Sequence, residues 1–391
     1  MTARQPFAID CIVGTRPNFV KIAPILRALR SRPGVVTRLV HTGQHYDFLM
    51  DAVFFEELRI PAPDINLGIG SGTAASQIAR MMLAFERVFS EKRPDLVIVV
   101  GDVNSTLGAA LAATKMSIPV AHVEAGLRSW DRSMPEEVNR VLVDQIASLH
   151  FVTEPSGMDN LARENIAPEH IHLVGNVMID SLLLNLDRAI APDDTFAEMG
   201  VAEIFRRTAR TRGYLFATLH RPGNVDDPAK LEELLRTLER VSRKIPLVFA
   251  IHPRTRSNIA NLGLDRWLVG PMLGTTGPLS YLRTLGMMQS ARAVITDSGG
   301  IQEETTALGV PCLTMRENTE RPITIAQGTN VLIGLDMGLL EQKVAEILAF
   351  GGISGRIPPL WDGKAAERIA EAVLAFLARA AVPAREACPV A

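Results

Sequence analysis

Several features that would place a protein in a special class are scarce in this chain of 391 residues. It has only three cysteines, Cys11, Cys312 and Cys388, which lie far apart without the spacing of metal ligands. This pattern favours a reducing, cytoplasmic setting over a disulfide framework. No stretch approaches the roughly 18 apolar residues of a membrane span, and the N-terminal apolar run is too short for a signal peptide. We therefore expect a cytoplasmic protein that is not inserted in a membrane.

An excess of charge of one sign is also missing. The chain carries 41 basic and 43 acidic residues, a formal net charge of −2, and these residues are scattered rather than grouped in blocks. Such a balance provides no electrostatic footprint for nucleic acid or an anionic membrane. The GK[ST] of a Walker A loop and the GxGxxG fingerprint are absent too, so ATP hydrolysis and NAD binding lack their usual support.

What the sequence does contain is a regular alternation of short apolar runs with helical patterns. The expected strands are residues 8–13, 36–41, 96–100, 119–123, 150–153, 214–220, 246–252, 292–296, 311–315 and 330–334. Apolar runs separated by helices are typical of parallel strands buried on both faces. The sequence therefore predicts an α/β protein with two Rossmann-like, doubly wound domains.

The expected domains divide near LVGNVMID, residues 173–180. The first covers residues 1–175 and the second covers residues 176–364. A terminal helix within 365–391 is expected to pack back on the first domain. Ligands of parallel sheets bind beyond the carboxyl ends of the strands, and almost every functional-looking residue follows an expected strand. We therefore expect one ligand cleft between two facing domains.

The segment TDSGGIQEE, residues 296–304, lies between an expected strand and an expected helix. Ser298, Gly299 and Gly300 would let backbone N–H groups approach a phosphate at the positive end of a helix. A structural alternative is that Ser298 only caps a tightly packed helix. Arg16, Lys21 and Arg321 favour an anion site, because basic residues at two strand-end clusters suit a diphosphate.

Acidic residues after the strands of the first half are the candidates for acid/base chemistry. Asp102 follows LVIVVG, Glu124 follows PVAHV, and Glu136 lies in SMPEEVNR. Glu136 could instead complete a capping box with Ser133, and Asp102 could cap the next helix. Glu124 has no such alternative, and Arg128 would be within its reach if the segment were helical. Three carboxyls near a diphosphate would repel one another, which favours a protonated acid beside a base.

Two histidines follow strands of the second half. His220, in LHRPGN, is the better candidate for a proton donor or phosphate ligand, although it could merely close the loop. His252, before Pro253, is a weaker candidate for a substrate contact. No cluster with metal-ligand spacing is apparent.

Taken together, the strand-end segments resemble a known family. VGTRPNFVKIAP, HTGQH, GDVNSTL, HVEAGLRS, MPEEVNR, GNVMID, LHRPGN, TDSGGIQEE and MRENTERP occur in this order between about residues 10 and 335. They are similar to the motifs of the non-hydrolysing UDP-N-acetylglucosamine 2-epimerases. The resemblance implies a glycosyltransferase-B-like fold, a homodimer, and reversible interconversion of UDP-GlcNAc and UDP-ManNAc without NAD or a metal ion.

The resemblance also implies roles for individual residues. In the family, UDP is eliminated across C1 and C2 of the sugar and then added again, with the proton delivered to the other face. The implied acid/base groups are Asp102, Glu124 and Glu136, and His220 would assist departure of the phosphate. The implied substrate contacts are Arg16, Lys21, Arg128, His252, Ser298, Gly299, Gly300, Arg321 and, on the ribose, Glu304.

The resemblance places Gln44, His45 and Arg221 at positions associated with a second, activating UDP-GlcNAc. Two other activities remain open at this stage. The substrate could be a related UDP-2,3-diacetamido sugar, or the chain could be a glycosyltransferase that uses a UDP-sugar donor on the same fold. Incubation with UDP-GlcNAc alone separates an epimerase from a transferase, because only the epimerase forms product without an acceptor.

Overall fold

The structure, a computed structural model, describes residues 5–43 and 48–380 and divides the chain into two compact units. Unit 1 comprises Met1–Ser181 together with Leu360–Ala391, and unit 2 comprises Leu182–Pro359. The chain passes from unit 1 to unit 2 inside helix α7 (Val177–Asn185). Among the described residues, no helix combines the length and apolar character that crossing a membrane requires.

Unit 1 is built on a sheet of seven parallel strands in the order β3-β2-β1-β4-β5-β6-β7. The strands are β1 (Phe7–Val13), β2 (Val35–His41), β3 (Ile65–Asn66), β4 (Leu96–Val100), β5 (Val120–Ala125), β6 (Leu149–Val152) and β7 (Ile171–Leu173). Every residue of β4 and β5 is buried. A sheet whose central strands are covered on both faces explains why these strands appear in the sequence as continuous apolar runs.

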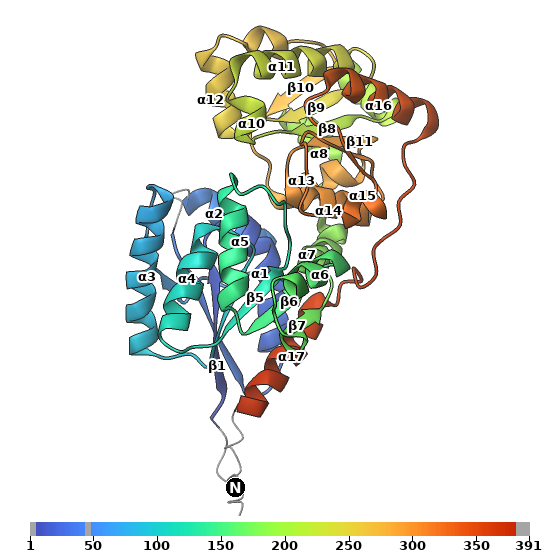
Figure 1. Cartoon of the computed structure of the whole chain (residues 1–391). Helices are drawn as coiled ribbons and strands as arrows, with labels where there is room; N and C mark the ends of the chain where they lie inside the picture. The colour runs from blue at the N-terminus through green and yellow to red at the C-terminus, as the bar shows by residue number, and fades with distance from the viewer. Residues whose placement is uncertain (1–4, 44–47, 381–391) are drawn as a thin grey trace, which may run out of the picture. The chain divides into compact units, whose positions relative to one another are not determined.

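Helices flank both faces of this sheet (Figure 1). They are α1 (Arg16–Arg30), α2 (Phe48–Glu57), α3 (Ala74–Glu91), α4 (Asn104–Lys115), α5 (Pro135–Ile146), α6 (Pro155–Arg163) and α17 (Ala365–Ala380), with a 3-10 turn, η1 (Pro168–His170). On one face α3, α4 and α5 lie side by side and form a core with Val97 and Val99, in which Phe85 stacks on Phe89 at 5.4 Å between ring centroids.

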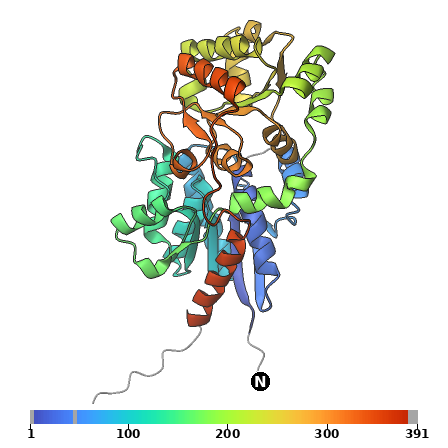
Figure 2. The same cartoon turned by 90° about the vertical axis from the view of Figure 1, so that its right-hand side faces the viewer.

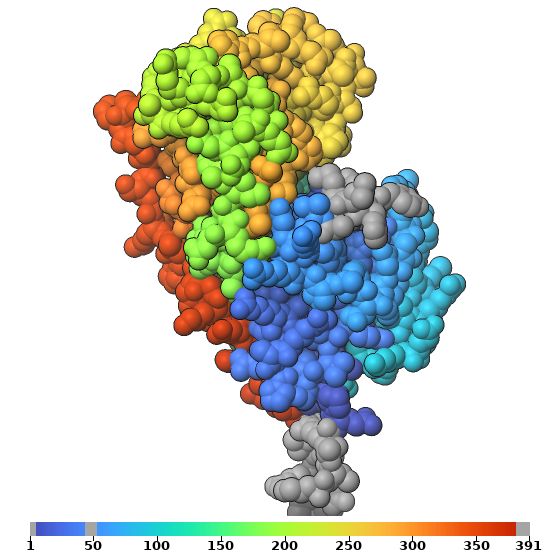
Figure 3. Space-filling model, turned by 180° about the vertical axis from the view of Figure 1, so that it is seen from behind, coloured from blue at the N-terminus to red at the C-terminus, as the bar shows by residue number. Residues whose placement is uncertain are grey.

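The last described helix, α17, packs on α1 of unit 1 (Figure 2). Asp180 of α7 fixes the start of α17, because its carboxylate accepts hydrogen bonds from the N–H groups of Ala365 (3.1 Å) and Ala366 (2.7 Å). In the space-filling view, red atoms of the C-terminal segment border blue atoms of the N-terminal part of unit 1 (Figure 3). Unit 1 is therefore completed by a segment distant in sequence.

Unit 2 repeats the same design with six parallel strands in the order β10-β9-β8-β11-β12-β13. The strands are β8 (Leu215–Thr218), β9 (Leu247–Ala250), β10 (Leu273–Thr276), β11 (Ala293–Thr296), β12 (Cys312–Thr314) and β13 (Asn330–Leu332). Alternate residues of β8 face opposite cores, with Leu215 and Ala217 in one and Phe216 in the other. This alternation follows from the period of two residues along a strand.

The helices of unit 2 also cover both faces of its sheet. They are α8 (Pro192–Glu198), α9 (Glu203–Arg212), α10 (Pro222–Val225), α11 (Pro228–Ser242), α12 (Pro253–Asn261), α13 (Tyr281–Gln289), α14 (Gly299–Leu308), α15 (Ile323–Ala326) and α16 (Met337–Phe350), with 3-10 turns η2 (Leu186–Arg188) and η3 (Asp265–Leu268). The predicted fold class, with two doubly wound α/β domains, is confirmed.

Candidate functional site

In unit 1, the carboxyl ends of the neighbouring strands β1, β4 and β5 carry Gly14, Gly101 and Glu124. Asn18, in the first turn of α1, organises this edge. Its side-chain oxygen accepts hydrogen bonds from the N–H groups of Gly14 and Thr15, both at 3.1 Å, and its amide nitrogen donates to the carbonyl of Val100 at 3.0 Å. The ends of β1 and β4 are thereby joined at the start of α1.

Glu124 is held in an unusual backbone conformation at the end of β5. Its φ of +71° lies in the left-handed region, and the pairing of β5 with β6 shifts register between Val123 and Ala125. A left-handed residue other than glycine stores strain that the surrounding structure must outweigh, and such residues gather at functional sites. The shift in register therefore directs a specific carboxylate toward the strand ends.

The Glu124 carboxylate forms an ion pair with the ammonium group of Lys21 from α1. Both residues are 5% exposed. Gly101 lies against this pair, since a Cβ at Gly101 would come within 2.9 Å of Lys21 Nζ and 3.6 Å of Glu124 Oε2. The two predicted site residues Lys21 and Glu124 are thus in direct contact.

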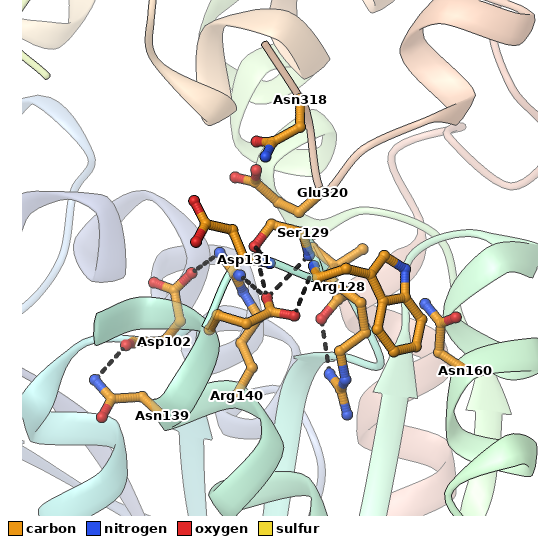
Figure 4. Close-up of polar contacts among 12 residues, drawn as sticks. Asp102, Arg128, Ser129, Asp131, Asn139, Arg140, Asn160, Asn318 and Glu320 are labelled. Carbon is orange, nitrogen blue, oxygen red and sulfur yellow. Dashed lines mark hydrogen bonds and ion pairs between the residues drawn. The ribbon is translucent and has the colours of Figure 1, made fainter. Parts of the chain in front are cut away.

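Asp102 follows Gly101 and is paired with Arg140 of α5 at 2.6 Å (Figure 4). Its side chain is 20% exposed, and its backbone carbonyl accepts a hydrogen bond from Asn139 at 2.7 Å. The alternative in which Asp102 caps the next helix is wrong. Helix α4 has Val103 at its N-cap and lacks a side-chain cap bond. The carboxyl of Asp102 is therefore bound by a cation rather than used as a cap.

Glu136 stands in the first turn of α5 and is partly exposed. The capping box expected between Ser133 and Glu136 is not formed, because Met134 occupies the N-cap position and the Ser133 hydroxyl donates to Asp131 at 2.6 Å. The carboxylate of Glu136 is therefore not used as a cap in a capping box. Helix α5 starts instead with Pro135, whose fixed φ suits the first turn.

Glu137, the next residue, was not singled out from the sequence. Its carboxylate accepts hydrogen bonds from the N–H groups of Ser129 and Trp130, both at 2.9 Å, and from the Ser129 hydroxyl at 3.0 Å. It also pairs with Arg140 at 2.7 Å, so the guanidinium of Arg140 joins Glu137 to Asp102. A buried glutamate thus fixes the loop that follows Glu124 and supports the partner of Asp102.

Arg128 does not reach toward Glu124, because residues 127–130 are not helical. Its guanidinium is paired with Asp144 at 2.8 Å and with Glu164 at 2.6 Å. Arg16, the first residue of α1, places its guanidinium over the ring of Phe54 at 5.6 Å. The predicted contacts Gln44 and His45 lie outside the described residues.

In unit 2, Asp297 follows β11 and organises the end of β8. Its buried carboxylate accepts the backbone N–H groups of His220 (2.9 Å) and Arg221 (2.8 Å) and the side-chain N–H of Asn224 (2.9 Å). The Nδ1 atom of His220 lies 2.9 Å from the carboxylate as well. Burial alone would raise the pKa of Asp297, but these hydrogen bonds and the histidine outweigh it and lower the pKa.

This arrangement fixes His220 while leaving its side chain 39% exposed at the strand end. Its ring lies 5.3 Å from that of His252, which accepts the Arg254 N–H at 3.3 Å and so caps α12. Arg221 Nε donates to the carbonyl of Asp297 at 3.0 Å. The two predicted histidines therefore lie together, and Asp297 supports them. The position of Asp297, directly after an apolar strand, is a signal from which the sequence could have predicted this role.

The Ser298-Gly299-Gly300 segment begins α14, with Ser298 at the N-cap position. Ser298 occupies the position that the capping alternative gave it, but its side chain makes no cap hydrogen bond. Gly299 has a definite reason to be glycine, because a Cβ there would meet Arg321 NH1 at 2.4 Å. The guanidinium of Arg321 thus crosses the first turn of α14, where backbone N–H groups also favour an anion.

Arg321 is almost fully buried and is itself surrounded by carboxylates. Its Nε atom lies 2.9 Å from Glu303, and its NH1 group pairs with Glu320. Arg316 adds a second cation to this cluster by pairing with Glu320 at 2.7 Å. The cluster holds the guanidinium of Arg321 at the start of α14 rather than leaving it free in solvent.

Glu304 is buried beside Tyr281 and Glu303. Burial raises the pKa of Glu304 to about 8, with a contribution from the negative charge of Glu303, although a hydrogen bond with Tyr281 lowers it in part. The carboxyl of Glu304 is therefore protonated over most of the neutral range. A group in this state can donate one hydrogen bond as well as accept others.

The site residues fall into two sets. In unit 1, Lys21, Glu124 and Asp102 meet around Gly101, with Arg140 as the second cation, so the repulsion expected between carboxyls is offset by paired charges. In unit 2, His220, His252, the start of α14 and Arg321 occupy the ends of strands and loops around β8 and β11. Within the described residues, no group of three or more His, Cys, Asp or Glu side chains is arranged to hold a metal ion.

The two doubly wound units place this chain in the class of two-domain α/β proteins with a glycosyltransferase-B-like fold. A lipopolysaccharide outer core galactosyltransferase shares this fold at a TM-score of 0.52 and 13% identity, covering 95% of this chain and all of that one. The family model for UDP-N-acetylglucosamine 2-epimerase matches residues 27–374. The chain belongs to the UDP-N-acetylglucosamine 2-epimerase family.

Individual relatives agree with this assignment. A UDP-N-acetylglucosamine 2-epimerase of Methanocaldococcus jannaschii is 40% identical over 364 residues, covering 92% of this chain and 97% of the relative. A crystal structure of the M. jannaschii UDP-GlcNAc 2-epimerase in complex with UDP-GlcNAc and UDP matches at a TM-score of 0.82 and 38% identity, covering 95% of this chain and 100% of that one. A UDP-2,3-diacetamido-2,3-dideoxy-D-glucuronate 2-epimerase of Pseudomonas aeruginosa is 37% identical over 372 residues, covering 92% and 97%.

Proposed function

We propose that this protein interconverts UDP-GlcNAc and UDP-ManNAc by inverting C2 of the sugar. The observation that carries the proposal is the pair of cation-bound carboxylates at adjacent strand ends of unit 1, Glu124 with Lys21 and Asp102 with Arg140, in a chain of this family. The strained backbone at Glu124 supports a functional rather than a structural role for its carboxyl.

The chemistry requires a route around an unstabilised carbanion, because C2 of the sugar is not adjacent to a carbonyl. In the proposed elimination a base takes the C2 proton, the C2–H electrons form the C1=C2 bond, and the C1–O bond breaks with its electrons leaving on UDP. UDP then adds back at C1 while a proton is delivered to the opposite face of C2. General acid and base groups contribute on the order of 10²- to 10⁴-fold to such steps.

The residues of unit 1 supply the proton traffic in this proposal. Glu124, paired with Lys21, acts as a base, and Asp102 and Glu136 complete the set of acid/base groups. Arg16 and Lys21 are the cations of α1 that favour the leaving diphosphate. Arg128 binds substrate less directly, since both of its carboxylate partners already hold its guanidinium in place.

The residues of unit 2 hold UDP. The N–H groups at the start of α14, with Ser298, Gly299 and Gly300, receive a phosphate, and Arg321 adds positive charge at the same turn. His220, held by Asp297, assists departure of the phosphate, and His252 lies beside it. Glu304 contacts the ribose hydroxyls.

The protein works in the cytoplasm as a homodimer, with Gln44, His45 and Arg221 in an activator site.

The second candidate function is epimerisation of a related UDP-2,3-diacetamido sugar acid, and the name of the Pseudomonas aeruginosa relative favours it. Proton NMR of the enzyme in D₂O tests both functions. With UDP-GlcNAc alone we expect UDP-ManNAc and deuterium at C2 of both sugars. If UDP-GlcNAc gives neither product nor exchange but the diacetamido uronate gives both, the assignment moves to the second function. The absence of product and exchange with both substrates would refute the proposal.

A further inference from the structure

Beneath the acidic strand ends of unit 1 lies a group of charged side chains that the proposed chemistry does not use. His122 in β5 and Asp144 in α5 are both fully buried, at 0% exposure. His122 Nδ1 lies 2.6 Å from Asp144 Oδ1, and His122 Nε2 lies 2.9 Å from the backbone carbonyl of Gly101. Burying ionisable groups is costly unless their polar atoms are satisfied, so such a pair calls for a reason.

Both ring nitrogens of His122 face oxygen atoms that can accept hydrogen bonds. Nε2 lies against the carbonyl of Gly101, and Nδ1 lies against the Asp144 carboxylate. Asp144 also pairs with Arg128, which pairs in turn with Glu164. The His122 ring is therefore held from both sides.

Asp144 extends this network to a second stretch of backbone. Its Oδ2 atom accepts the N–H of Gly126 at 3.1 Å and the guanidinium of Arg128 at 2.8 Å. Each of the two held glycines lies close in sequence to one of the acidic residues: Gly126 is two residues after Glu124, and Gly101 directly precedes Asp102. Both glycines have left-handed φ values, +69° at Gly101 and +79° at Gly126, so these turns depend on groups that hold them in place.

We propose that His122 and Asp144 are positioning residues that set the separation of the Asp102 and Glu124 carboxyls by fastening Gly101 and Gly126 to one buried histidine–aspartate pair. The inference rests on the proposed epimerase function. Neither residue needs to touch substrate, since each acts through the backbone segment that it holds. Misplacement of a reacting group by about 1 Å can cost on the order of 100-fold in rate, so loss of this link should be seen in turnover.

His150 offers a matched control in the neighbouring strand β6. It is 1% exposed and is the direct cross-strand partner of His122. Its Nε2 atom lies 2.7 Å from the backbone carbonyl of Asp144, within helix α5, and the hydrogen bonds of its ring reach neither Gly101 nor Gly126. Replacing either histidine removes a buried hydrogen-bonded ring from the same sheet, but only His122 links the two acidic strand ends.

The test compares His122→Asn, His122→Gln and His150→Asn with the wild type by steady-state kinetics on UDP-GlcNAc, UDP calorimetry and thermal unfolding. An asparagine at 122 reaches Asp144 but not Gly101, whereas the longer glutamine places an amide N–H near the position of Nε2. We expect kcat to fall about 100-fold in His122→Asn. It should stay within about fivefold of the wild-type value in His122→Gln and within about twofold in His150→Asn. KM and the UDP affinity should stay within about twofold throughout.

The outcomes separate the inference from the function on which it rests. A wild type that does not epimerise any UDP-HexNAc would refute the proposed function and this inference with it. If the wild type is active, any of three results would refute the positioning role alone. These are equal losses of kcat in His122→Asn and His150→Asn, an unchanged kcat in His122→Asn, or a His122→Gln variant as impaired as His122→Asn. If His122→Asn does not fold, Asp144→Asn, whose single amide oxygen cannot accept hydrogen bonds from both His122 and Gly126, is judged by the same comparison with His150→Asn.

Discussion

The protonated state of Glu304 leads to a test of the unit 2 site in the absence of any ligand. The substitution Glu304→Gln keeps the shape of the buried side chain and removes its titration. Burial and the neighbouring Glu303 raise the pKa of Glu304 in the folded protein, whereas the unfolded chain returns it to an ordinary value. The native state therefore binds a proton that the unfolded state has lost across the interval between the two values.

The magnitude follows from linkage. The pKa moves from 4.5 to about 8, and each unit corresponds to about 1.4 kcal/mol. The stabilisation from the bound proton is fully present below pH 4.5 and is lost as the pH rises to about 8. Its upper bound is about 5 kcal/mol, and for a unit of this size about 1 kcal/mol changes the melting temperature by roughly 2–4 °C.

The assay is thermal unfolding, followed by circular dichroism, of wild type and Glu304→Gln between pH 5 and 8.5. We expect the wild type to lose about 10 °C more than the variant over this range, and taking the difference cancels other groups that titrate in both proteins. Glu341→Gln, which removes a partly exposed partner of Arg240, serves as the control and should follow the wild type. Parallel curves for wild type and Glu304→Gln would refute the argument that Glu304 is buried in its neutral form.

Three further perturbations address other parts of the molecule. Gly299→Ala should weaken UDP binding by about tenfold or more in calorimetry, because the added Cβ would displace Arg321. Gly277→Ala, where the added Cβ has open space around it, should leave the affinity unchanged, and equal affinities of the two variants would remove Arg321 from the phosphate site. Asp102→Asn and Glu124→Gln should each lower kcat at least about 100-fold with the fold retained, and near-normal turnover in both would defeat the acid/base assignment. Asp180→Ala should destabilise unit 1 by about 1–2 kcal/mol in urea by removing the cap of α17, and an unchanged midpoint would show that the packing of α17 suffices.

Much of the fold was predictable because strand signals in this sequence are strong and local. The runs LVIVV and PVAHV are apolar, sit between helices, and correspond to the buried strands β4 and β5. Strand β10 (Leu273–Thr276), by contrast, reads LGTT and was not expected. It lies at the edge of its sheet, where one side lacks a neighbouring strand and the apolar signal is weaker.

Which residues belong to the site was easier to predict than the contacts between them. Strand-end position alone pointed to Asp102, Glu124 and His220, because parallel strands gather such residues at one edge. The contacts that hold them join segments far apart in the chain, such as Arg140 with Asp102 and Asp297 with His220. Local rules instead suggested side-chain cap bonds at Asp102 and Ser298, which do not form, and at Asp102 the partner is Arg140, supplied by tertiary structure.

The way the chain leaves unit 1 in α7 and returns for α17 constrains how the protein is made. During synthesis on the ribosome, all residues of unit 2 emerge before the helix that completes unit 1. The apolar face of α17, with Ile369, Val373 and Leu377, follows unit 2 and covers a surface of unit 1 that stays uncovered until then. Domains generally fold as they emerge, so unit 2, although encoded later than most of unit 1, should be able to reach its native state first.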